Sequence, residues 1–320
     1  MSVLIFAELD EGKLKGSSKE AIYYGSKVAE SLGTAATAIV IGQADDAELA
    51  TAGRFGAAKV LHAADSKLTE ANGMAYASVV AAAAEQEGST VVVVAKSSLG
   101  DAMAARLAGK LRAGLAANVV DLPNLSNGFR VKRSIYTGKA FAETELTADK
   151  KILAIKKNTI TPEEKEATAS VEAFSPALND SDFVLKVTNT EKATGDVLLP
   201  EADLVVSAGR GLKGPENWGI VEDLAKALGA ATACSKPVSD LDWRPHHEHV
   251  GQTGIKISPN LYIAAGISGA IQHLAGVNSS KVIVVINKDP EAPFFKSADY
   301  GIVGDVFDIL PRLTKAVNAL

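Results

Sequence analysis

Short apolar segments alternate with helical patterns in the first third of the chain, and this alternation restricts the fold more than any other feature. The apolar segments cover residues 3–8, 35–41, 59–63 and 90–95. The helical patterns cover residues 17–32, 45–55, 70–86 and 99–113. A capping-box pattern, Ser17 followed by Glu20, opens the first of these helices. Apolar strands in alternation with helices are typical of a doubly wound parallel sheet, which we predict here.

The pattern changes after residue 117. Residues 128–147 alternate polar and apolar side chains, and residues 151–156 and 170–174 look similar. Such alternation favours antiparallel strands with one solvent-exposed face, so we expect these segments to close one edge of the first sheet. Residues 188–195 are polar, and we place a domain boundary there. The expected domains are residues 1–190 and 191–320.

The alternation of strands and helices begins again after this boundary. Strands are predicted at residues 203–208, 232–234, 261–265, 282–287 and 300–303. Helices are predicted at residues 215–228, 267–274 and 306–317. The chain is therefore predicted to be α/β, with two doubly wound parallel-sheet domains. The first domain has an added antiparallel edge, and the second carries a ligand site.

Composition and charge exclude several classes of protein. The net charge is −5 and the pI is about 5.6, whereas nucleic-acid-binding domains are usually basic. The single cysteine, Cys234, cannot form a disulfide within the chain, which favours a reducing compartment. No apolar run approaches the ~18 residues that span a bilayer, and the strand that starts at Ser2 leaves no room for a signal peptide. We expect a soluble, cytoplasmic protein.

Two glycine-rich segments in the second domain have the clearest ligand-binding pattern, Val250-Gly-Gln-Thr-Gly254 and Gly266-Ile-Ser-Gly-Ala-Ile-Gln-His273. Glycine lets a backbone approach a ligand closely, and a helix N-terminus favours an anion. We expect a diphosphate at the turn around Ser268 and a polar ring system near Thr253 and His273. The alternative for His273 is a hydrogen-bonded packing residue that contacts no ligand.

A third glycine-rich segment, Gly209-Arg-Gly-Leu-Lys-Gly214, lies between a strand and a helix, as in dinucleotide-binding folds. The acidic ribose ligand expected ~20 residues further on is missing. A tight turn without a ligand is an equal alternative, although Arg210 could bind a phosphate with two hydrogen bonds. Ser235 and Lys236 end a strand, where they could bind a ligand oxygen and stand over a ring, or be solvated.

Three histidines cluster in His246-His-Glu-His249, which raises the question of a metal site. On a helix, His246 and His249 would share a face. However, Pro245 and Gly251 indicate a loop, and no second ligand cluster lies nearby. We interpret the segment as a polar surface loop at the mouth of the site.

Polar residues also follow the last two strands, as Asn287 and Asp305. Open α/β sheets bind ligands at the carboxyl ends of strands, and a carboxylate there suits a ribose diol. Asp305 also fits the N-cap of the helix at residues 306–317, and both roles are compatible. The sequence has no nucleophile elbow, no Walker A loop and no paired zinc-ligand motif.

Several segments resemble the alpha subunit of electron transfer flavoproteins. They are Val250–Gly254, Tyr262-Ile-Ala-Ala-Gly-Ile-Ser-Gly-Ala-Ile-Gln-His-Leu-Ala-Gly276, Ile286-Asn-Lys-Asp-Pro-Glu-Ala-Pro293, Ala298-Asp-Tyr-Gly-Ile-Val303 and, in the first domain, Tyr136-Thr-Gly-Lys-Ala140. The resemblance implies a noncovalent FAD held mainly by the C-terminal domain. It also implies a heterodimer with a beta subunit, usually AMP-bearing, that docks on the first domain.

The resemblance further implies which residues contact FAD. By position they are Arg210, Ser235, Lys236, Val250, Gly251, Gln252, Thr253, Ser268, Gly269, Ala270, Ile271, Gln272, His273, Asn287, Asp305 and Val306. Ser268 and Gln272 would serve the diphosphate, and Asn287 with Asp305 the adenosine end.

The flavin end carries a departure from the family pattern, because Lys236 stands where the family typically has arginine over the ring. Lysine keeps a positive charge that favours negative charge on the reduced ring, but it lacks the flat, stacking guanidinium. Thr253 would lie near flavin N5 and His273 near its N1/O2 edge. The His-rich segment also departs from the commoner family sequence and could bring His246 or His247 near the flavin.

The function implied by the resemblance is electron transfer rather than bond-making catalysis. The protein would take electrons from dehydrogenases, such as the acyl-CoA dehydrogenases of fatty acid β-oxidation, and deliver them to a membrane quinone oxidoreductase. The alternatives are an NADH-dependent electron-bifurcating flavoprotein subunit and a non-redox nucleotide sensor of the same fold.

Overall fold

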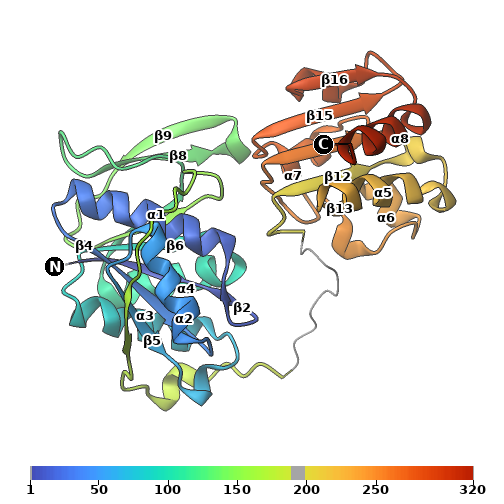
Figure 1. Cartoon of the computed structure of the whole chain (residues 1–320). Coiled ribbons are helices and arrows are strands. Elements are labelled where there is room, and N and C mark those ends of the chain that lie inside the picture. Colours follow the sequence, from blue (N-terminus) through green and yellow to red (C-terminus); the bar gives the residue numbers. More distant parts are fainter. Residues whose placement is uncertain (1, 189–198, 320) are drawn as a thin grey trace. The chain divides into compact units, whose positions relative to one another are not determined.

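The computed structural model describes residues 2–188 and 199–319. The chain divides into two compact units, Met1–Thr190 and Glu191–Leu320 (Figure 1). The polar segment in which we expect the domain boundary, residues 188–195, lies outside the described residues except for Thr188. Within the described parts, no helix is long and apolar enough to cross a bilayer.

Unit 1 contains a nine-stranded sheet with the order β11-β5-β4-β1-β6-β10-β7-β8-β9. In that order, the strands are Ser170–Ala173, Lys59–Ala63, Ala35–Ile41, Ser2–Ala7, Val91–Ala95, Lys151–Ile155, Gly114–Val119, Arg130–Ile135 and Ala140–Glu145. The first seven strands of the order are parallel, and β8 pairs antiparallel with β7 and β9. A small antiparallel hairpin, β2 (Leu9–Asp10) with β3 (Lys13–Leu14), follows β1.

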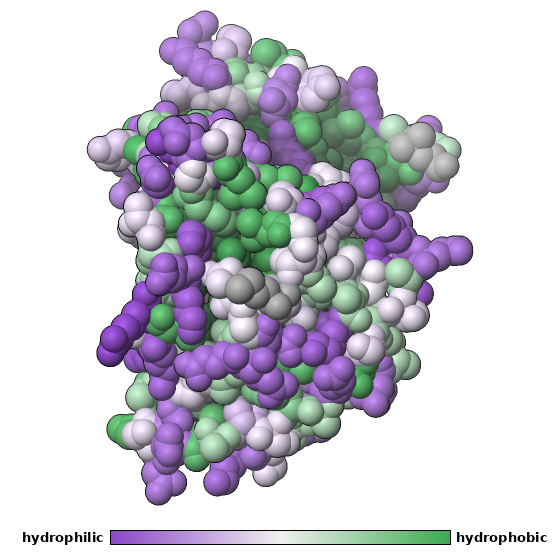
Figure 2. Space-filling view, turned by 90° about the vertical axis from the view of Figure 1, so that its left-hand side faces the viewer, coloured by the Kyte–Doolittle hydropathy of each residue, from purple (hydrophilic) through white to green (hydrophobic). Residues whose placement is uncertain are grey.

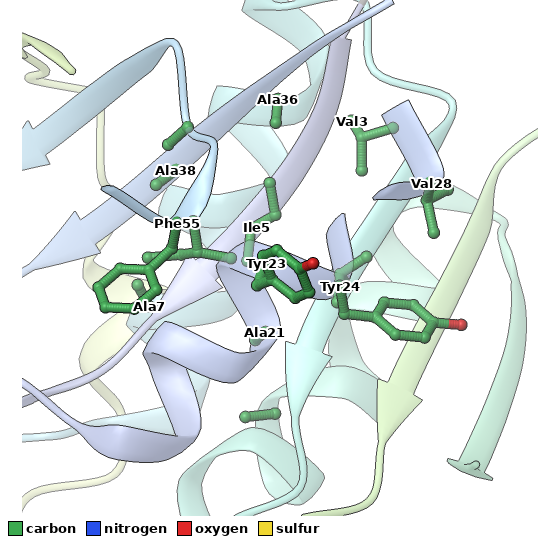
Figure 3. Packing of buried hydrophobic residues seen from close by; sticks show 14 of the residues in the cluster. Val3, Ile5, Ala7, Ala21, Tyr23, Tyr24, Val28, Ala36, Ala38 and Phe55 are labelled. Atoms are coloured by element: carbon green, nitrogen blue, oxygen red, sulfur yellow. The ribbon is translucent and has the colours of Figure 1, made fainter. Parts of the chain in front are cut away.

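The helices of unit 1 cover both faces of this sheet. They are α1 (Gly16–Ser31), α2 (Asp46–Ala50), α3 (Gly73–Gln86) and α4 (Ser98–Leu111). On one face, Tyr24 of α1 belongs to a core that includes Ile5 of β1 (Figure 3). On the other face, Met103 of α4 belongs to a core that includes Leu4. Because successive side chains of a strand point to opposite faces, β1 supplies both cores, as a central parallel strand must.

Two strands of unit 1 are placed differently from our expectation. Residues 151–156 and 170–174 were expected to be antiparallel edge strands, which is wrong. β10 is parallel and lies between β6 and β7, while β11 is parallel and lies at the far edge beside β5. β10 is apolar and buried on both faces after its first residue, which suits the centre of a parallel sheet. The antiparallel expectation is correct for β8 and β9, and β7 was not predicted.

The predicted capping box at the start of the first helix is also wrong. The N-cap position of α1 is Lys15, and no side chain caps this helix end. Ser18 is buried and instead binds the backbone of Glu8, accepting from its N–H at 2.7 Å and donating to its carbonyl at 3.0 Å. The hydroxyl therefore ties the end of β1 to α1, a tertiary contact that competes with local capping.

Glu20, the second residue of the expected box, is buried beneath the segment that follows β10. Its two carboxylate oxygens accept from the backbone N–H groups of Asn158 and Ile160, each at 3.1 Å. An ionised carboxylate makes stronger hydrogen bonds to backbone donors than a neutral acceptor does. Glu20 therefore fixes the path of the chain between β10 and β11.

Unit 2 contains a five-stranded parallel sheet with the order β13-β12-β14-β15-β16. In that order, the strands are Ala231–Cys234, Leu204–Ala208, Leu261–Ala265, Val282–Asn287 and Tyr300–Val303. β13 lies on one side of β12, and all later strands lie on the other. The strand order therefore reverses between β12 and β14, and open α/β sheets have a crevice at the carboxyl ends of strands at such a reversal.

The helices of unit 2 also cover both faces of the sheet. They are α5 (Gly219–Leu228), α6 (Lys236–Asp240), α7 (Ile271–Val277) and α8 (Val306–Val317). α5 and α8 share one core, which includes Leu310, whereas α7 contributes to the opposite core around Tyr262 and Phe294. The helix predicted at residues 267–274 begins at Ile271, because Gly269 has a φ of +82° that a helix does not allow. The predicted fold class, two doubly wound α/β sheets with an antiparallel edge on the first, is confirmed.

We predict that Glu20→Gln lowers the free energy of unfolding of unit 1 by about 2 kcal/mol, because the amide turns one acceptor into a donor against a backbone N–H. Glu30→Gln on the same helix is a matched control. The Glu30 carboxylate is exposed and pairs with Lys27 at 3.2 Å, which contributes only a few tenths of a kcal/mol. Urea unfolding followed by circular dichroism compares the two variants. Equal losses would contradict the anchoring role of Glu20.

Candidate functional site

A cleft of about 850 Å³ opens in unit 2, lined by the segments that follow all five parallel strands and by the turn at residues 250–253. Most residues predicted to bind a ligand line this cleft. They are Arg210, Ser235, Lys236, Val250, Gly251, Gln252, Thr253, Ser268, Ala270, Gln272, His273, Asn287, Asp305 and Val306. Gly269 and Ile271 do not line it. Strand ends that are far apart in the sequence therefore bring the predicted set together.

Part of the cleft wall is formed where two loops cross in backbone contact. A Cβ atom on Gly211 would lie 2.6 Å from the Cα of Gly266, and the reverse distance is 2.8 Å. The Gly211 N–H also donates to the Gly266 carbonyl at 3.1 Å. Neither position can carry a side chain without separating the loops. In the Gly209–Gly214 segment, therefore, Gly211 serves loop packing, and Arg210 and Lys213 are the charged residues that line the cleft.

Gly269 and Ile271 lie outside the cleft for different reasons. Ser268 and Ala270 line the cleft on either side of Gly269, and Gln272 and His273 line it from the first turn of α7. Gly269 packs on Phe294 instead, whose Cβ would lie 2.4 Å from a Cβ at position 269. The side chain of Ile271 is 61% exposed.

His273 lies in the cleft wall with its ring almost completely buried. Its Nε2 is 2.7 Å from the hydroxyl of Tyr262, and its Nδ1 has no hydrogen bond of regular geometry. Burial, followed by the positive charge that His249 can carry, lowers the pKa of His273 to about 4, and the nearby Val250 carbonyl opposes this shift. His273 is therefore uncharged at neutral pH, with one unsatisfied ring nitrogen beside the cleft.

The His-rich segment contributes a residue that the sequence analysis did not select. His246 and His247 are exposed and are not among the residues that line the cleft, so the approach of either to a ligand stays a prediction. His249 lines the cleft instead, and its buried Nδ1 has no partner. A Cβ on Gly254 would lie 2.8 Å from this Nδ1, so the imidazole supports the turn at residues 250–254. The position of His249 directly before the predicted ligand-binding segment at Val250 is the sequence feature that could have identified it.

The loop that carries these histidines is held by Arg244. Its guanidinium donates to both carboxylate oxygens of Glu248, at 2.9 and 2.6 Å, and to Glu222 of α5 at 2.8 Å. It also stacks over Trp218, 5.5 Å from the ring centroid. A bidentate, partly buried ion pair of this kind is a strong anchor. It fixes Glu248, and with it the backbone next to His249. Among the described residues, no group of three or more potential ligands could hold a metal.

Charged side chains of both signs line the cleft. The cations are Arg210, Lys213, Lys236 and Lys288, and the carboxylates are Asp240, Asp289 and Asp305. Lys236 Nζ is 3.5 Å from Asp240 Oδ1, and both side chains are more than half exposed. An exposed pair of this kind contributes little, so the Lys236 ammonium is available to a ligand. The sequence analysis did not select Lys213 or Lys288, although both follow strand ends.

Asn287 and Asp305 have local structural roles as well as cleft positions. Asn287 donates through its amide to the carbonyl of Ile267 at 3.0 Å, which ties the end of β15 to the turn after β14. Asp305 is the N-cap of α8 and accepts from the Phe307 N–H at 3.0 Å through Oδ1. The N-cap role that we expected for Asp305 is thus present, and its position in the cleft leaves the carboxylate open to a ligand.

These features fit a flavin dinucleotide. The volume lies within the ~300–1,000 Å³ typical of pockets for organic ligands and cofactors. Two buried imidazoles, His249 and His273, have nitrogens that lack partners, whereas buried polar atoms are normally hydrogen-bonded. The cations of the cleft offer charge to a diphosphate, and Asp305 offers an acceptor to ribose hydroxyls.

Comparison with known proteins gives matches over both units. A family model described as the electron transfer flavoprotein domain matches residues 3–179. A second, described as the electron transfer flavoprotein FAD-binding domain, matches residues 198–278. The second match contains the crossing loops, the histidine loop and most of the cleft residues up to α7.

Individual relatives match over nearly the whole chain. The electron transfer flavoprotein subunit alpha of Bacillus subtilis (strain 168) is 38% identical over 324 residues, covering 99% of this chain and 98% of the relative. The protein of the same description from Thermoanaerobacterium thermosaccharolyticum is 34% identical over 325 residues, with the same shares covered. Protein FixB of Escherichia coli O157:H7 is 35% identical over 296 residues, covering 90% and 92%.

The pKa of His273 predicts an acid-dependent loss of stability. In the unfolded chain this histidine binds a proton below its ordinary value of 6.5, but in the folded unit it does so only near 4. Its contribution is therefore complete above pH 6.5 and is lost as the pH falls to 4, by on the order of 3 kcal/mol. Urea unfolding across this range, followed by tryptophan fluorescence, reports unit 2 alone because Trp218 and Trp243 are the only tryptophans of the chain.

Two variants isolate this contribution. His273→Gln should flatten the fall in stability between pH 6.5 and 4, whereas His247→Gln, at an exposed position in the same unit, should leave its slope unchanged. The same slope in wild type and His273→Gln would contradict the assignment.

Proposed function

The chain belongs to the electron transfer flavoprotein family as an alpha subunit, and we propose that it binds one FAD noncovalently in the cleft of unit 2 and works as an electron carrier. The observation that carries the proposal is the convergence of residues from five strand ends on one cleft with unsatisfied imidazole nitrogens. FAD would supply reversible uptake and release of electrons, which no side chain here supplies.

The polar end of the cleft would hold the dinucleotide. Arg210, Ser268 and Gln272 would bind the diphosphate. All three line the cleft and can donate hydrogen bonds, and Arg210 and Ser268 lie close in sequence to the loop crossing at Gly211 and Gly266. Asn287 and Asp305 would bind the adenosine end, where a carboxylate accepts from two ribose hydroxyls. Asp305 could bind ribose hydroxyls through its carboxylate and still keep its N-cap hydrogen bond to the Phe307 N–H of α8.

The opposite end would hold the flavin ring between Lys236, Thr253 and His273. Lys236 is the charged member of this group, and its ammonium would favour electron uptake by stabilising negative charge. His273 contributes no charge at neutral pH, because its pKa is lowered to about 4. Lys236 is therefore the residue through which this chain sets the charge at the ring.

An alpha subunit implies a beta-subunit partner, and we assign its docking surface to unit 1. The hairpin of β8 and β9 leaves Tyr136 and Phe141 exposed, at 76% and 58%. Large exposed hydrophobic side chains that lie close together mark protein interfaces more often than free surface. On the face that Figure 2 displays, hydrophobic areas interrupt a mainly hydrophilic surface. By family resemblance the beta subunit would carry AMP.

The electrons would come from flavoprotein dehydrogenases such as acyl-CoA dehydrogenases, and would pass to a membrane quinone oxidoreductase. The direct test is to co-express the chain with its beta subunit, purify the pair and release the cofactor by acid. One FAD per pair and reduction by an acyl-CoA dehydrogenase with its substrate are expected. A colourless pair that binds no added FAD would falsify the proposal. Rapid reduction by NADH would indicate the bifurcating alternative, and tight binding of AMP or ATP in place of FAD the sensor.

Asp305→Ser separates ligand binding from helix capping. Serine keeps an N-cap acceptor for Phe307 but removes the carboxylate, so α8 remains capped. We expect the Kd for FAD to rise about tenfold, equivalent to about 1.4 kcal/mol for lost charge-assisted hydrogen bonds. Asp308→Ser is the control, since Asp308 pairs with Arg312 and lies outside the cleft. Titration of the flavin-free pair with FAD measures both, and equal affinities would remove Asp305 from the site.

Lys236→Gln tests the charge at the ring. We expect the flavin midpoint potential to fall by roughly 50 mV, about 1 kcal/mol for one electron, because an exposed cation acts through solvent. The Lys236 side chain is 58% exposed. Lys226→Gln removes a lysine of α5 that lies outside the cleft and should leave the potential unchanged. Spectroelectrochemical titration provides the comparison, and equal potentials would place Lys236 away from the ring.

A further inference from the structure

A buried tyrosine lies behind the cleft wall and contacts it only through His273. Tyr262 of β14 is completely buried, and its hydroxyl is 2.7 Å from His273 Nε2. Its ring packs near Phe294, 6.4 Å between centroids, and His273 packs edge-on against the same phenylalanine at 5.8 Å. Tyr262 itself does not line the cleft. It is therefore placed to act on a ligand through the imidazole rather than directly.

The direction of this hydrogen bond follows from the surroundings of the two side chains. Tyr262 keeps its proton, because burial raises the pKa of its hydroxyl. If His273 donated from Nε2, the tyrosine proton would need another acceptor. Ser207 Oγ on β12 lies near the Tyr262 hydroxyl, but it makes no hydrogen bond of regular geometry. Donation from Tyr262 to Nε2 requires no second acceptor.

The other imidazole nitrogen favours the same direction. With Nε2 as donor, the neutral ring would leave an unprotonated Nδ1 lone pair buried beside the Val250 carbonyl, which is also an acceptor. With Nδ1 protonated, its N–H faces that carbonyl, although the two form no hydrogen bond of regular geometry. The partner of one imidazole nitrogen thus sets the protonation of the other.

We infer that Tyr262 is a positioning residue of this site, whose hydroxyl donates to His273 Nε2 and holds His273 in the neutral form that carries its proton on Nδ1. The orientation of the ring is fixed from the strand, and its N–H is directed towards the turn that carries Val250. That turn is also bound to α7, because the Gln252 N–H donates to the Gln272 carbonyl at 2.7 Å. The inference rests on the proposed function only for the identity of the ligand.

A fixed protonation state of His273 limits which groups this position offers to a ligand. A neutral imidazole with Nε2 already occupied offers the cleft no negative or acceptor group at this position. It also withholds the positive charge that a free histidine would supply to a reduced flavin at mildly acidic pH. Tyr262 would therefore keep the charge of His273 constant over the pH range in which free histidines titrate. His249, whose charge acts on His273 and which also lines the cleft, is a second titratable group at this wall.

The test is nitrogen NMR of the alpha–beta pair labelled with ¹⁵N-histidine. The chain contains five histidines, and the His273 signals are identified by their loss in His273→Gln. Wild type should show protonated Nδ1 and unprotonated Nε2 at pH 7. Tyr262→Phe should shift the ratio of the two tautomers towards Nε2–H by about tenfold or more, the equivalent of one lost hydrogen bond. Protonated Nε2 in wild type would overturn the inference without any variant.

A matched variant separates positioning from lost stability. Tyr24→Phe removes the hydroxyl of a buried tyrosine in unit 1 that donates to the Asp121 carbonyl at 2.8 Å. It should leave the His273 tautomer and the flavin potential unchanged, whereas Tyr262→Phe should alter both and make the potential more dependent on pH below 7. A tautomer that is the same in Tyr262→Phe as in wild type contradicts the inference. If the pair binds no flavin, the proposed function fails, and the NMR result alone still decides the role of Tyr262.

Discussion

The cleft of unit 2 depends on the contact between two backbones, where the loops after β12 and β14 cross at Gly211 and Gly266. A side chain at either position would meet the other loop at less than 3 Å. Such a clash cannot be relieved by rotating a side chain, so the loops would have to separate. Arg210 follows one strand end and Ser268 the other, so separation would move both at once. The crossing therefore sets the spacing of the polar groups around it. The ion pair of Arg244 and the N-cap at Asp305 then fix other segments near the cleft.

The two units differ in how far their buried polar side chains are hydrogen-bonded. In unit 1, Ser18 and Glu20 are buried but fully used in binding backbone groups. Among the described residues, the buried side-chain atoms without a partner all belong to unit 2. Each such atom costs about 1–3 kcal/mol, a cost that a purely structural unit would avoid. Two of them are the Nδ1 atoms of His249 and His273, which lie in residues of the cleft wall. The other three belong to Ser207, Trp218 and Asn260, which do not line the cleft.

The sequence predicts features that depend on local pattern, and fails where the choice of a partner is non-local. Alternating strands and helices identify both sheets, and strand ends identify most of the cleft. β10 could not be placed from its own residues, since its neighbours β6 and β7 are selected by packing across the whole unit. The expected capping box failed for the same reason, because Ser18 found a better partner in Glu8. Gly269 and Ile271 were assigned to the cleft by their position in the family pattern, whereas Gly269 packs on Phe294 and Ile271 is exposed outside the cleft. His249 was missed because Pro245 and Gly251 indicate a loop, so the whole segment was interpreted as surface.

The central position of β10 has a consequence for the order in which the chain folds as it is synthesised. β6 and β7 leave the ribosome first, and the edges that β10 will join remain open until residue 155 has emerged. Open strand edges pair readily with other chains, so this interval is when unit 1 is most exposed to misassembly. In unit 2, β14 joins β12, and β15 and β16 are then added outward, each beside the strand made before it. The nascent chain is therefore most prone to misassembly before unit 2 has been synthesised.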